Sequence, residues 1–235
     1  MAVMTATADW ADRLSAARPA LERASTADLV AAVLRENVIE GSLPPGTRLS
    51  EEIIGRALGV SRNTLREAFR LLSHENLLVH EFHRGMFVRR LTAADVADIY
   101  RMRRPLETAG LRAAGTAPAE AVREVGRRVE EGRAAAEAGD WVAVGTANMR
   151  FHQAVAALLG SHRADEAMAR ILAELRLAFH MMGEPRPFHE PYLDDNARIA
   201  ALLGEGEYER ASGVLLAYLD AAEAQLLSAY GEHPS

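Results

Sequence analysis

One segment, residues 59–91, constrains the fold of this chain more than any other: GVSRNTLREAFRLLSHENLLVHEFHRGMFVRRL. Gly59 is expected to end a short helix, because glycine accepts the left-handed conformation that often terminates helices. Ser61 follows after a tight turn and is expected to cap the next helix. The apolar residues of that helix recur at helical spacing on one face: Leu65, Ala68, Phe69 and Leu72. The pattern predicts two helices joined by a tight turn, the second of which packs through one face.

The periodicity of the same segment then changes. Two short runs, LLVHEF and GMFVRRL, are rich in Val, Leu and Phe, the residue types that favour strands. His83, Arg84 and Gly85 lie between the two runs. This arrangement predicts a β-hairpin with a basic tip.

Upstream residues complete the pattern. Residues 1–24 are expected to form a loosely ordered N-terminal arm. Ser25 or Thr26 is a suitable N-cap for a first helix, which GSLPPGTRLS stops with glycine and two prolines, and Ser50 is a suitable cap for EEIIGRAL. Residues 25–91 therefore predict helix, helix, turn, helix and a two-stranded wing, which is the order of a winged helix-turn-helix.

The chain as a whole is acidic, but one segment has the positive charge that a nucleic-acid partner requires. The formal net charge is −6, and all 27 basic residues are arginine. Residues 61–90 nevertheless hold 6 Arg against 3 Glu. A helix of this kind enters the DNA major groove, where arginine reaches guanine or phosphate oxygens, while a wing tip approaches the minor groove. We expect residues 25–91 to bind double-stranded DNA.

A structural explanation competes for the arginine row. Arg62, Arg66 and Arg70 equally suit a solvated helix face that pairs with Glu67 or Glu75. The turn, the cap and the wing together favour DNA binding over this explanation.

The remaining residues, 92–230, predict an antiparallel helical bundle without a convincing strand. Thr92 is expected to cap the first of six helical segments. A Pro-rich break, EPRPFHEPY, separates the fourth and fifth segments, and MMGEPRPFHEPY is a candidate mobile loop. His180 and His189 flank this break and have two explanations: they line the mouth of the pocket in the bundle, or they are surface residues, as most such histidines are. The fold class is therefore mainly α: a winged helix-turn-helix followed by an all-α bundle.

Composition excludes several other classes. The chain has no cysteine, so it holds no disulfide, thiolate metal site or cysteine nucleophile. No apolar run approaches the roughly 18 residues of a membrane span. The first residues lack the apolar core of a signal peptide. We expect a cytoplasmic protein that does not act at a membrane.

Four stretches together resemble the GntR family of bacterial transcription regulators, in its FadR-type branch with a helical FCD effector domain: LPPGTRLSE, LGVSRNTLREAFRLL, LLVHEFHRGMFVRRLT and DVADIYRMRRPLE. The resemblance covers residues 25–230 and is most specific in the N-terminal part. It implies a homodimer that binds a short palindromic operator. It also implies a small organic effector, which we expect to carry a carboxylate, and residues 92–230 as the domain for effector binding and dimerisation. We expect a repressor and not an enzyme.

The resemblance also assigns the DNA contacts. Those of the recognition helix are Ser61, Arg62, Asn63, Thr64 and Arg66. Those of the wing are His83, Arg84 and Gly85. Many relatives carry arginine in the second helix where this chain has Glu52, so Arg48 or Arg56 has to replace that contact.

In many FCD domains an aspartate, a histidine four residues later and two further histidines hold a divalent metal. His152 fits the first histidine, but Asn148, Asn196 and Tyr218 stand at the other three positions. Amide oxygens and a neutral phenol are poorer ligands for Zn or Ni than carboxylate or imidazole. We expect no tightly bound metal, and instead a polar cluster that binds an organic effector directly. In the alternative, His152 is a core histidine hydrogen-bonded to Asn148 or Tyr218.

Arg103 also has two explanations. The resemblance implies that it binds an effector carboxylate through a bidentate fork. Helical spacing equally allows an ion pair with Glu107 at i+4.

Two functions from other classes compete with DNA-binding regulation. One is a metal-dependent enzyme that uses Asn148, His152, His180 and His189, but the chain has no HExxH or Ser-His-Asp arrangement to support it. The other is a protein-interaction module, against which the wing arginines and the spacing of Arg62 and Arg66 weigh.

Overall fold

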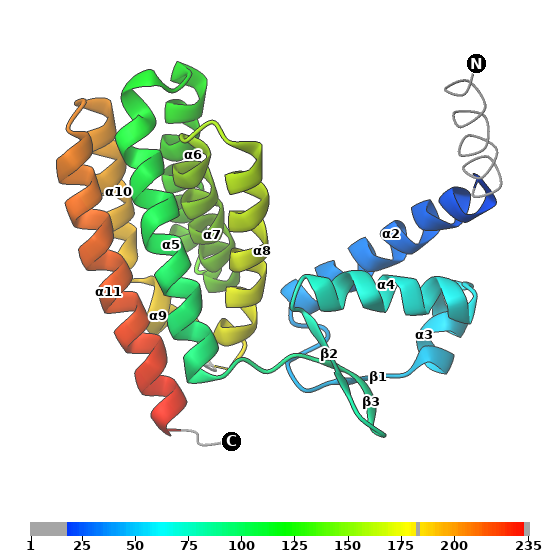
Figure 1. Ribbon diagram of the computed structural model, residues 1–235. Coiled ribbons are helices and arrows are strands. Elements are labelled where there is room, and N and C mark those ends of the chain that lie inside the picture. Colours follow the sequence, from blue (N-terminus) through cyan, green and yellow to red (C-terminus); the bar gives the residue numbers. More distant parts are fainter. Residues whose placement is uncertain (1–17, 182–183, 233–235) are drawn as a thin grey trace, which may run out of the picture. The chain divides into compact units, whose positions relative to one another are not determined.

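The computed structural model describes residues 18–181 and 184–232 of the 235-residue chain. The chain divides into two compact units, the first ending at Arg89 and the second beginning at Arg90. This division falls two residues before the predicted boundary between residues 91 and 92. Figure 1 labels the helices and strands of both units.

The first unit has these elements in chain order: α2 (Arg18–Ile39), β1 (Arg48–Leu49), α3 (Glu51–Leu58), α4 (Arg62–His74), β2 (Leu78–Glu81) and β3 (Gly85–Val88). The prediction that the first helix starts after Ser25 or Thr26 is wrong, because α2 begins at Arg18. Residues 20–23, ALER, are strong helix formers, so the helix continues upstream through both potential caps. Of the predicted arm, residues 1–17 lie outside the described residues.

The predicted caps of the next two helices are confirmed. The Ser50 side chain accepts a hydrogen bond from the backbone N–H of Ile53 at the start of α3. Gly59 ends α3 in the left-handed conformation with φ of 65°. The Ser61 side chain accepts a bond of 3.1 Å from the backbone N–H of Thr64 and so starts α4. These local signals are enough to set the turn between α3 and α4.

The wing is larger than the sequence predicts. The β2–β3 hairpin is confirmed, and its strands pair antiparallel. A third strand, β1, pairs with the other edge of β3 and gives the sheet order β1-β3-β2. Arg48 lies opposite Phe87, and Leu49 lies opposite Met86. The prediction of a two-stranded wing is therefore incomplete, because a two-residue strand carries no periodicity of its own.

Apolar side chains of α2, α4 and the wing form the core of the first unit. The predicted apolar face of α4 is buried: Leu65, Ala68, Phe69 and Leu72. Leu34 and Val38 of α2 are also buried, and α2 packs against α4. This packing leaves the opposite face of α4 exposed.

The second unit has these elements in chain order: α5 (Ala93–Ala113), the 3-10 helix η1 (Ala114–Thr116), α6 (Ala119–Glu137), α7 (Trp141–Ala157), α8 (His162–Phe179), α9 (Arg186–His189), α10 (Tyr192–Gly204) and α11 (Tyr208–Glu232). The six predicted helical segments are confirmed, and Thr92 caps α5 with Asp95 in a capping box. The interpretation of the Pro-rich break as a mobile loop is wrong for α9. Phe188 and His189 of this short helix are buried, because their rings pack against Phe179 at the end of α8.

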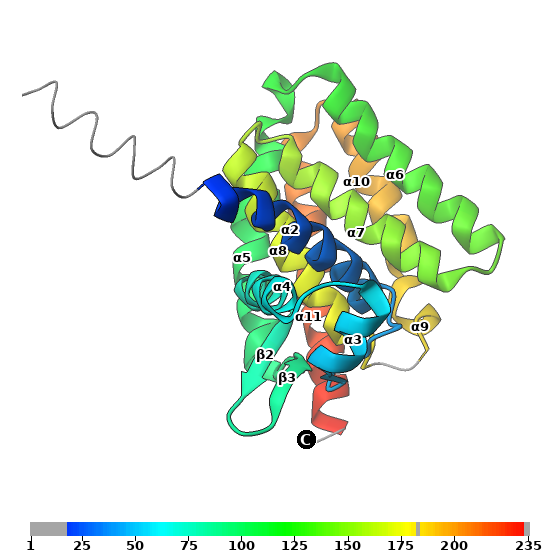
Figure 2. The ribbon, with the colours of Figure 1, turned by 90° about the vertical axis from the view of Figure 1, so that its right-hand side faces the viewer.

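The long helices of the second unit pack in alternating directions. Figure 1 shows α5 and α11 side by side and antiparallel, although they lie at opposite ends of the unit's sequence. Figure 2 shows α6 beside α7, with α10 near both. Within the described residues, none of the helices combines the length and hydropathy that a membrane span requires.

A glycine sets the distance between α5 and α7. A Cβ atom at Gly110 would lie 2.2 Å from the carbonyl oxygen of Val155, far closer than any real contact. The absent side chain allows the two backbones to approach. This approach brings polar side chains of α5 and α7 within hydrogen-bonding reach of each other.

Candidate functional site

The exposed face of α4 carries the predicted recognition-helix contacts. Ser61, Arg62, Asn63 and Arg66 are exposed, and Thr64 is half-buried. The Ser61 and Thr64 hydroxyls lie 2.8 Å apart, so part of their hydrogen-bonding capacity serves the helix cap. The Arg62 and Asn63 side chains extend outward from the first turn of the helix.

Most of the arginines of α3 and α4 form ion pairs with carboxylates. Arg66 donates to Glu51 at the start of α3 over 3.0 Å, an ion pair that helical spacing does not predict. Arg70 donates to Glu67 within α4, as the structural explanation of the arginine row expects. Both pairs are exposed, where such contacts stabilise the fold by at most about 1 kcal/mol. An anionic ligand of higher charge density therefore competes with them readily.

Glu52 has a partner of its own. Arg56 donates to it over 2.9 Å across one turn of α3, and both side chains are more than two-thirds exposed, at 79% and 71%. Arg56, one of the two arginines expected to replace a contact at the Glu52 position, is therefore paired with Glu52 itself.

The wing tip combines strained backbone with an exposed aromatic side chain. His83 has φ of 61°, and Gly85 has φ of 103°, which only glycine adopts without strain. Phe82 is 80% exposed, and its ring lies 4.0 Å from the ring of His83. Arg84 pairs with Glu81 and lies over the ring of Phe87. The tip therefore presents His83 and Phe82 outward more freely than Arg84.

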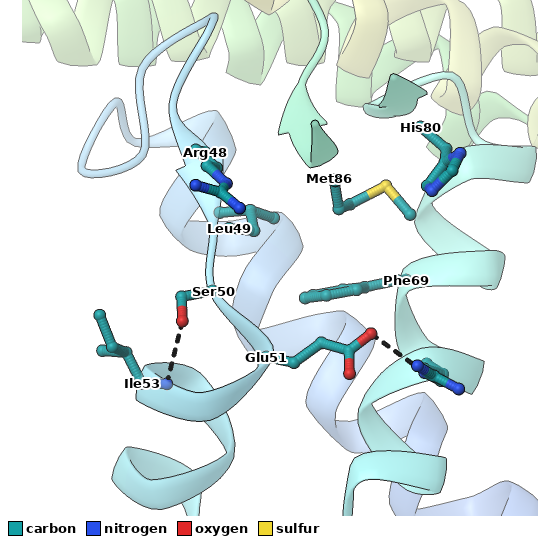
Figure 3. Close-up of a pocket in the computed structure, with 10 residues that line it drawn as sticks. Arg48, Leu49, Ser50, Glu51, Ile53, Phe69, His80 and Met86 are labelled. Carbon is teal, nitrogen blue, oxygen red and sulfur yellow. Dashed lines mark hydrogen bonds and ion pairs between the residues drawn. The ribbon is translucent and has the colours of Figure 1, made fainter. Parts of the chain in front are cut away.

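A groove of about 810 Å³ lies between α4 and the wing. We call it the α4–wing groove; its polar lining residues include Arg48, Glu51, Arg66 and His80. Figure 3 shows Arg48 and His80 on opposite sides, with Met86 and Phe69 between them. The groove thus adjoins both predicted DNA-binding elements of the first unit.

A buried polar cluster occupies the second unit. Its members come from four helices: Arg103 and Glu107 of α5, Asn148 and His152 of α7, Asn196 of α10, and Tyr218 of α11. All six are buried, with exposed fractions of 8% or less. The structure therefore brings together all five predicted effector residues and adds Glu107.

The hydrogen bonds of this cluster form a chain that donates toward Glu107 from both sides. Asn196 donates to Asn148 over 2.6 Å, and Asn148 donates to the hydroxyl of Tyr218 over 3.0 Å. The Tyr218 hydroxyl and Nε2 of His152 lie 2.8 Å apart. His152 Nδ1 lies 2.6 Å from Glu107, to which Arg103 donates over 2.8 Å. If Nδ1 carries the proton of a neutral His152, every link has one donor and one acceptor.

Burial and charge fix the protonation of this chain. Burial lowers the pKa of His152, which keeps the imidazole neutral, and burial raises the pKa of Tyr218, which keeps the phenol protonated. Burial also opposes the charge of Glu107, but the Arg103 guanidinium overrides it and lowers the pKa of that carboxyl. The cluster therefore holds one buried ion pair, Arg103–Glu107, and a neutral relay attached to it.

Both interpretations of the cluster residues find support in these contacts. Arg103 forms the predicted i+4 ion pair with Glu107, and its guanidinium also lies over the ring of Tyr100. His152 is a core histidine bonded to Tyr218, as the alternative expects, but its second partner is Glu107 rather than Asn148. Glu107 was missed as a site residue, although its position four residues after Arg103 was the available signal.

Two polar atoms at the ends of the chain lack partners. Nη2 of Arg103 and Oδ1 of Asn196 are buried without a hydrogen bond. One end of the chain therefore offers a free donor and the other a free acceptor. Buried groups of this kind cost roughly 1–3 kcal/mol each when left unsatisfied.

The donor set of the cluster does not fit the divalent metal that the FCD resemblance implies. Both nitrogens of His152 already have partners, and the other three positions offer two amides and a protonated phenol. Such donors bind Zn²⁺ or Ni²⁺ weakly. Among the described residues, no three His, Cys, Asp or Glu side chains gather at a point that suits a metal ion.

The histidines at the Pro-rich break differ in their burial. His180 is half-buried. His189 is buried, so the expectation that it lies at the surface is wrong. Gly145 makes this possible, because a Cβ atom there would lie 2.6 Å from Nε2 of His189. Burial lowers the pKa of His189 to about 4, with Arg176 as a second cause.

Comparisons with known proteins bear on both units. The family model for bacterial regulatory proteins of the gntR family matches residues 26–88, and the FCD domain model matches residues 98–221. The chain is 42% identical in sequence to a GntR transcriptional regulator from Rhodococcus sp. RHA1. That structure has a TM-score of 0.83, and the match covers 88% of this chain and 99% of the other. The crystal structure of Escherichia coli McbR/YncC shares the fold, with a TM-score of 0.74 at 22% identity over 87% of this chain and 98% of the other.

The curated relatives match only part of this chain. The chain is 40% identical over 88 residues to the gluconate operon transcriptional repressor of Bacillus subtilis, which is 37% of this chain and 36% of that protein. The chain spans about a third of the length of the curated relatives it matches first, 33% and 36%. The domain matches and the Rhodococcus structure together cover both units in the same order. The chain therefore belongs to the GntR family of bacterial regulatory proteins, and its helical unit is an FCD domain.

Proposed function

We propose that this protein is a DNA-binding transcriptional regulator, in the manner of a repressor, and that a small organic effector controls its affinity for an operator. The observation that carries the proposal is the exposed N-terminal half of α4 beside a basic wing tip. Arg62 and Arg66 are exposed and lie outside the buried face of α4, so the helix offers them to a DNA groove without disturbing the core. Such a regulator acts on chromosomal DNA, which places it in the cytoplasm.

The proposed DNA contacts divide between two elements. The recognition helix contributes Ser61, Arg62, Asn63, Thr64 and Arg66. The wing contributes His83, Arg84 and Gly85, and β1 contributes Arg48. Two copies of the chain, related by a two-fold axis, would place two such surfaces on a palindromic operator.

Selection from random duplexes tests this proposal. The full-length protein is mixed with a pool of random 30-base-pair duplexes, and bound DNA is amplified over several rounds. We expect a palindromic motif, bound as a dimer, with affinity that falls steeply as salt rises. A protein-interaction module would enrich no motif and show no such salt dependence, and that result would remove the proposal.

The effector proposal rests on the two unpartnered ends of the buried chain. Nη2 of Arg103 needs an acceptor such as a carboxylate oxygen, and Oδ1 of Asn196 needs a donor such as a hydroxyl. A compound that carries both groups, such as a hydroxycarboxylate, has the chemistry that these two ends require. We propose that such a compound binds among Arg103, Asn148, His152, Asn196 and Tyr218 without a resident metal.

Two measurements test the effector proposal. Calorimetry with a panel of small hydroxycarboxylates, matched against the corresponding alcohols and simple acids, is expected to favour compounds with both groups. Metal analysis of the purified protein is expected to find less than one divalent ion per chain. A stoichiometric ion that is lost in a His152→Ala variant would overturn the metal-free assignment.

The proposed control of DNA binding is a shift between populations. An effector that favours one arrangement of the two DNA-binding units in the dimer changes how often both recognition helices meet successive major grooves. The segment 89–92, between the wing and α5, is the proposed hinge.

A further inference from the structure

We infer that the α4–wing groove seats one sugar–phosphate strand of duplex DNA, and that Arg48 and Arg66 are its phosphate ligands. This inference rests on the proposed DNA binding and names a contact surface that neither α4 nor the wing provides alone. Arg48 lies on β1 and lines this groove. Its proposed role is to bind a phosphate there, and not to replace an arginine of α3.

The shape of duplex DNA leads to this assignment. If α4 lies in the major groove and the wing tip reaches the neighbouring minor groove, a sugar–phosphate strand separates the two elements. That strand has to cross the surface between α4 and the wing. The α4–wing groove, of about 810 Å³, occupies this surface, with Arg66 and Phe69 from α4 and His80 and Met86 from the wing (Figure 3).

The charge of the lining suits an anionic strand. Arg48 and Arg66 line the groove from two elements, and Glu51 is the one acidic side chain among its lining residues. Glu51 is already engaged, because it accepts the 3.0 Å hydrogen bond from Arg66. Arg48 is exposed, and no carboxylate of the described residues pairs with it. A phosphate in the groove would therefore contact the Arg48 guanidinium, which has no carboxylate partner among the described residues, and the Arg66 guanidinium, which pairs with Glu51.

The sheet fixes the position of Arg48. Pairing of β1 with β3 places Arg48 opposite Phe87 and Leu49 opposite Met86, so the Arg48 and Leu49 side chains leave opposite faces of the sheet. Leu49, Met86 and His80 share the face that lines the groove, and Arg48 joins the lining from the edge strand β1. A Cβ atom at Gly85 would lie 3.7 Å from Nε of Arg48, so the guanidinium lies against the glycine of the wing tip.

The salt dependence of DNA binding tests the role of Arg48. Full-length wild type, Arg48→Ala and the control Arg123→Ala are titrated with two 30-base-pair duplexes, one selected by the wild type and one unrelated. Arg123 is an exposed arginine of α6 that pairs with Glu120. Loss of one phosphate contact reduces the steepness of log K, the logarithm of the association constant, against log salt by about 0.9 per bound protomer. At 0.1 M salt, this change in slope corresponds to about eightfold weaker binding per protomer.

We expect Arg48→Ala to show this loss equally on both duplexes, since a phosphate contact carries no sequence information. The Arg123→Ala control is expected to match the wild type. If wild type binds and Arg48→Ala keeps the same slope and affinity as the control, the groove assignment is wrong while the proposed function stands. If wild type itself binds neither duplex at low salt, the proposed function fails first.

Substitution of single phosphates in the duplex identifies the sugar–phosphate linkages that contact the groove. A series of selected duplexes, each with one neutral methylphosphonate linkage, is measured against the wild type and Arg48→Ala. We expect wild type to lose affinity at linkages between the contacted major groove and the adjacent minor groove, and Arg48→Ala to be insensitive at one of these linkages. Equal penalties for both proteins at every linkage would show that Arg48 contacts no phosphate, and the inference would be withdrawn.

Discussion

His152 Nδ1 lies 2.6 Å from Oε2 of Glu107, although the two residues are 45 positions apart and both are buried. This contact joins the polar relay of α7, α10 and α11 to the Arg103–Glu107 ion pair of α5. It places the Glu107 carboxylate, whose pKa Arg103 lowers, against the histidine for which the FCD resemblance implied a metal-binding role.

Glu107→Gln is expected to destabilise the protein strongly. The substitution leaves the Arg103 guanidinium buried without a counter-charge, and breaking a buried pair in this way costs about 3–5 kcal/mol. Urea unfolding measures the loss. The control is Glu209→Gln, which removes the exposed pair with Arg112 and is expected to change the free energy of unfolding by less than about 0.5 kcal/mol. Equal effects for both variants would contradict the assignment.

Tyr218→Phe isolates the hydroxyl of the relay. The variant keeps the ring packing against Tyr192 but leaves Nε2 of His152 and Nδ2 of Asn148 without this partner. We expect a loss of roughly 1–3 kcal/mol in stability and a changed effector response. Basal affinity for the selected duplex, measured without effector, is expected to stay at the wild-type value. A variant with wild-type effector affinity would exclude Tyr218 from the effector site.

Arg66→Ala is expected to weaken binding of the selected duplex and to leave the fold intact. The Arg66 side chain is exposed, and its pair with Glu51 contributes at most about 1 kcal/mol to stability. Fluorescence anisotropy measures the affinity, and circular dichroism checks the fold. The companion variant Glu51→Gln removes the competing carboxylate and is expected to strengthen binding. Unchanged DNA affinity with an unchanged spectrum in Arg66→Ala would exclude the contact.

His189 makes stability depend on pH. Burial lowers its pKa from 6.5 to about 4, so the unfolded chain binds a proton that the folded chain rejects. The free energy of unfolding is therefore expected to fall as pH drops from about 6.5 to about 4, by roughly 3 kcal/mol for this group. His189→Gln should flatten that part of the curve, whereas His162→Gln, at a side chain that is 88% exposed, should not. If the free energy of unfolding depends on pH equally in the wild type and both variants, a group other than His189 causes the dependence.

Gly110→Ala tests the contact that sets the spacing of α5 and α7. Its Cβ would lie 2.2 Å from the Val155 carbonyl oxygen, so the helices have to separate and the relay has to stretch. We expect a loss of at least about 1–3 kcal/mol, as for other overpacked sites. Gly126→Ala in α6 is the matched control, since a Cβ there meets nothing within 4 Å, and it should stabilise the helix by about 0.5–1 kcal/mol. Thermal unfolding distinguishes the two outcomes.

The sequence by itself determined the local elements of this protein. Ser50, Ser61 and Thr92 cap helices where the sequence predicts, because a cap depends on residues within one turn of itself. Gly59 likewise ends α3 through its own backbone conformation. The helical periodicity of α4 also predicted its buried face, since one apolar stripe suffices to orient a helix.

Only the tertiary structure decided which distant residues meet. β1 is two residues long and exists because β3 pairs with it, so no local pattern predicts it, and only the folded chain brings Arg48 into the lining of the α4–wing groove. The Glu107 contact with His152 depends on how closely α5 and α7 approach, which a glycine and a distant carbonyl determine together. His189 is buried because aromatic rings and Gly145 leave space for it, although its Pro-rich surroundings resemble a surface loop. Caps and periodicity act within a few residues, whereas pairing, burial and pKa depend on neighbours that only the folded chain brings together.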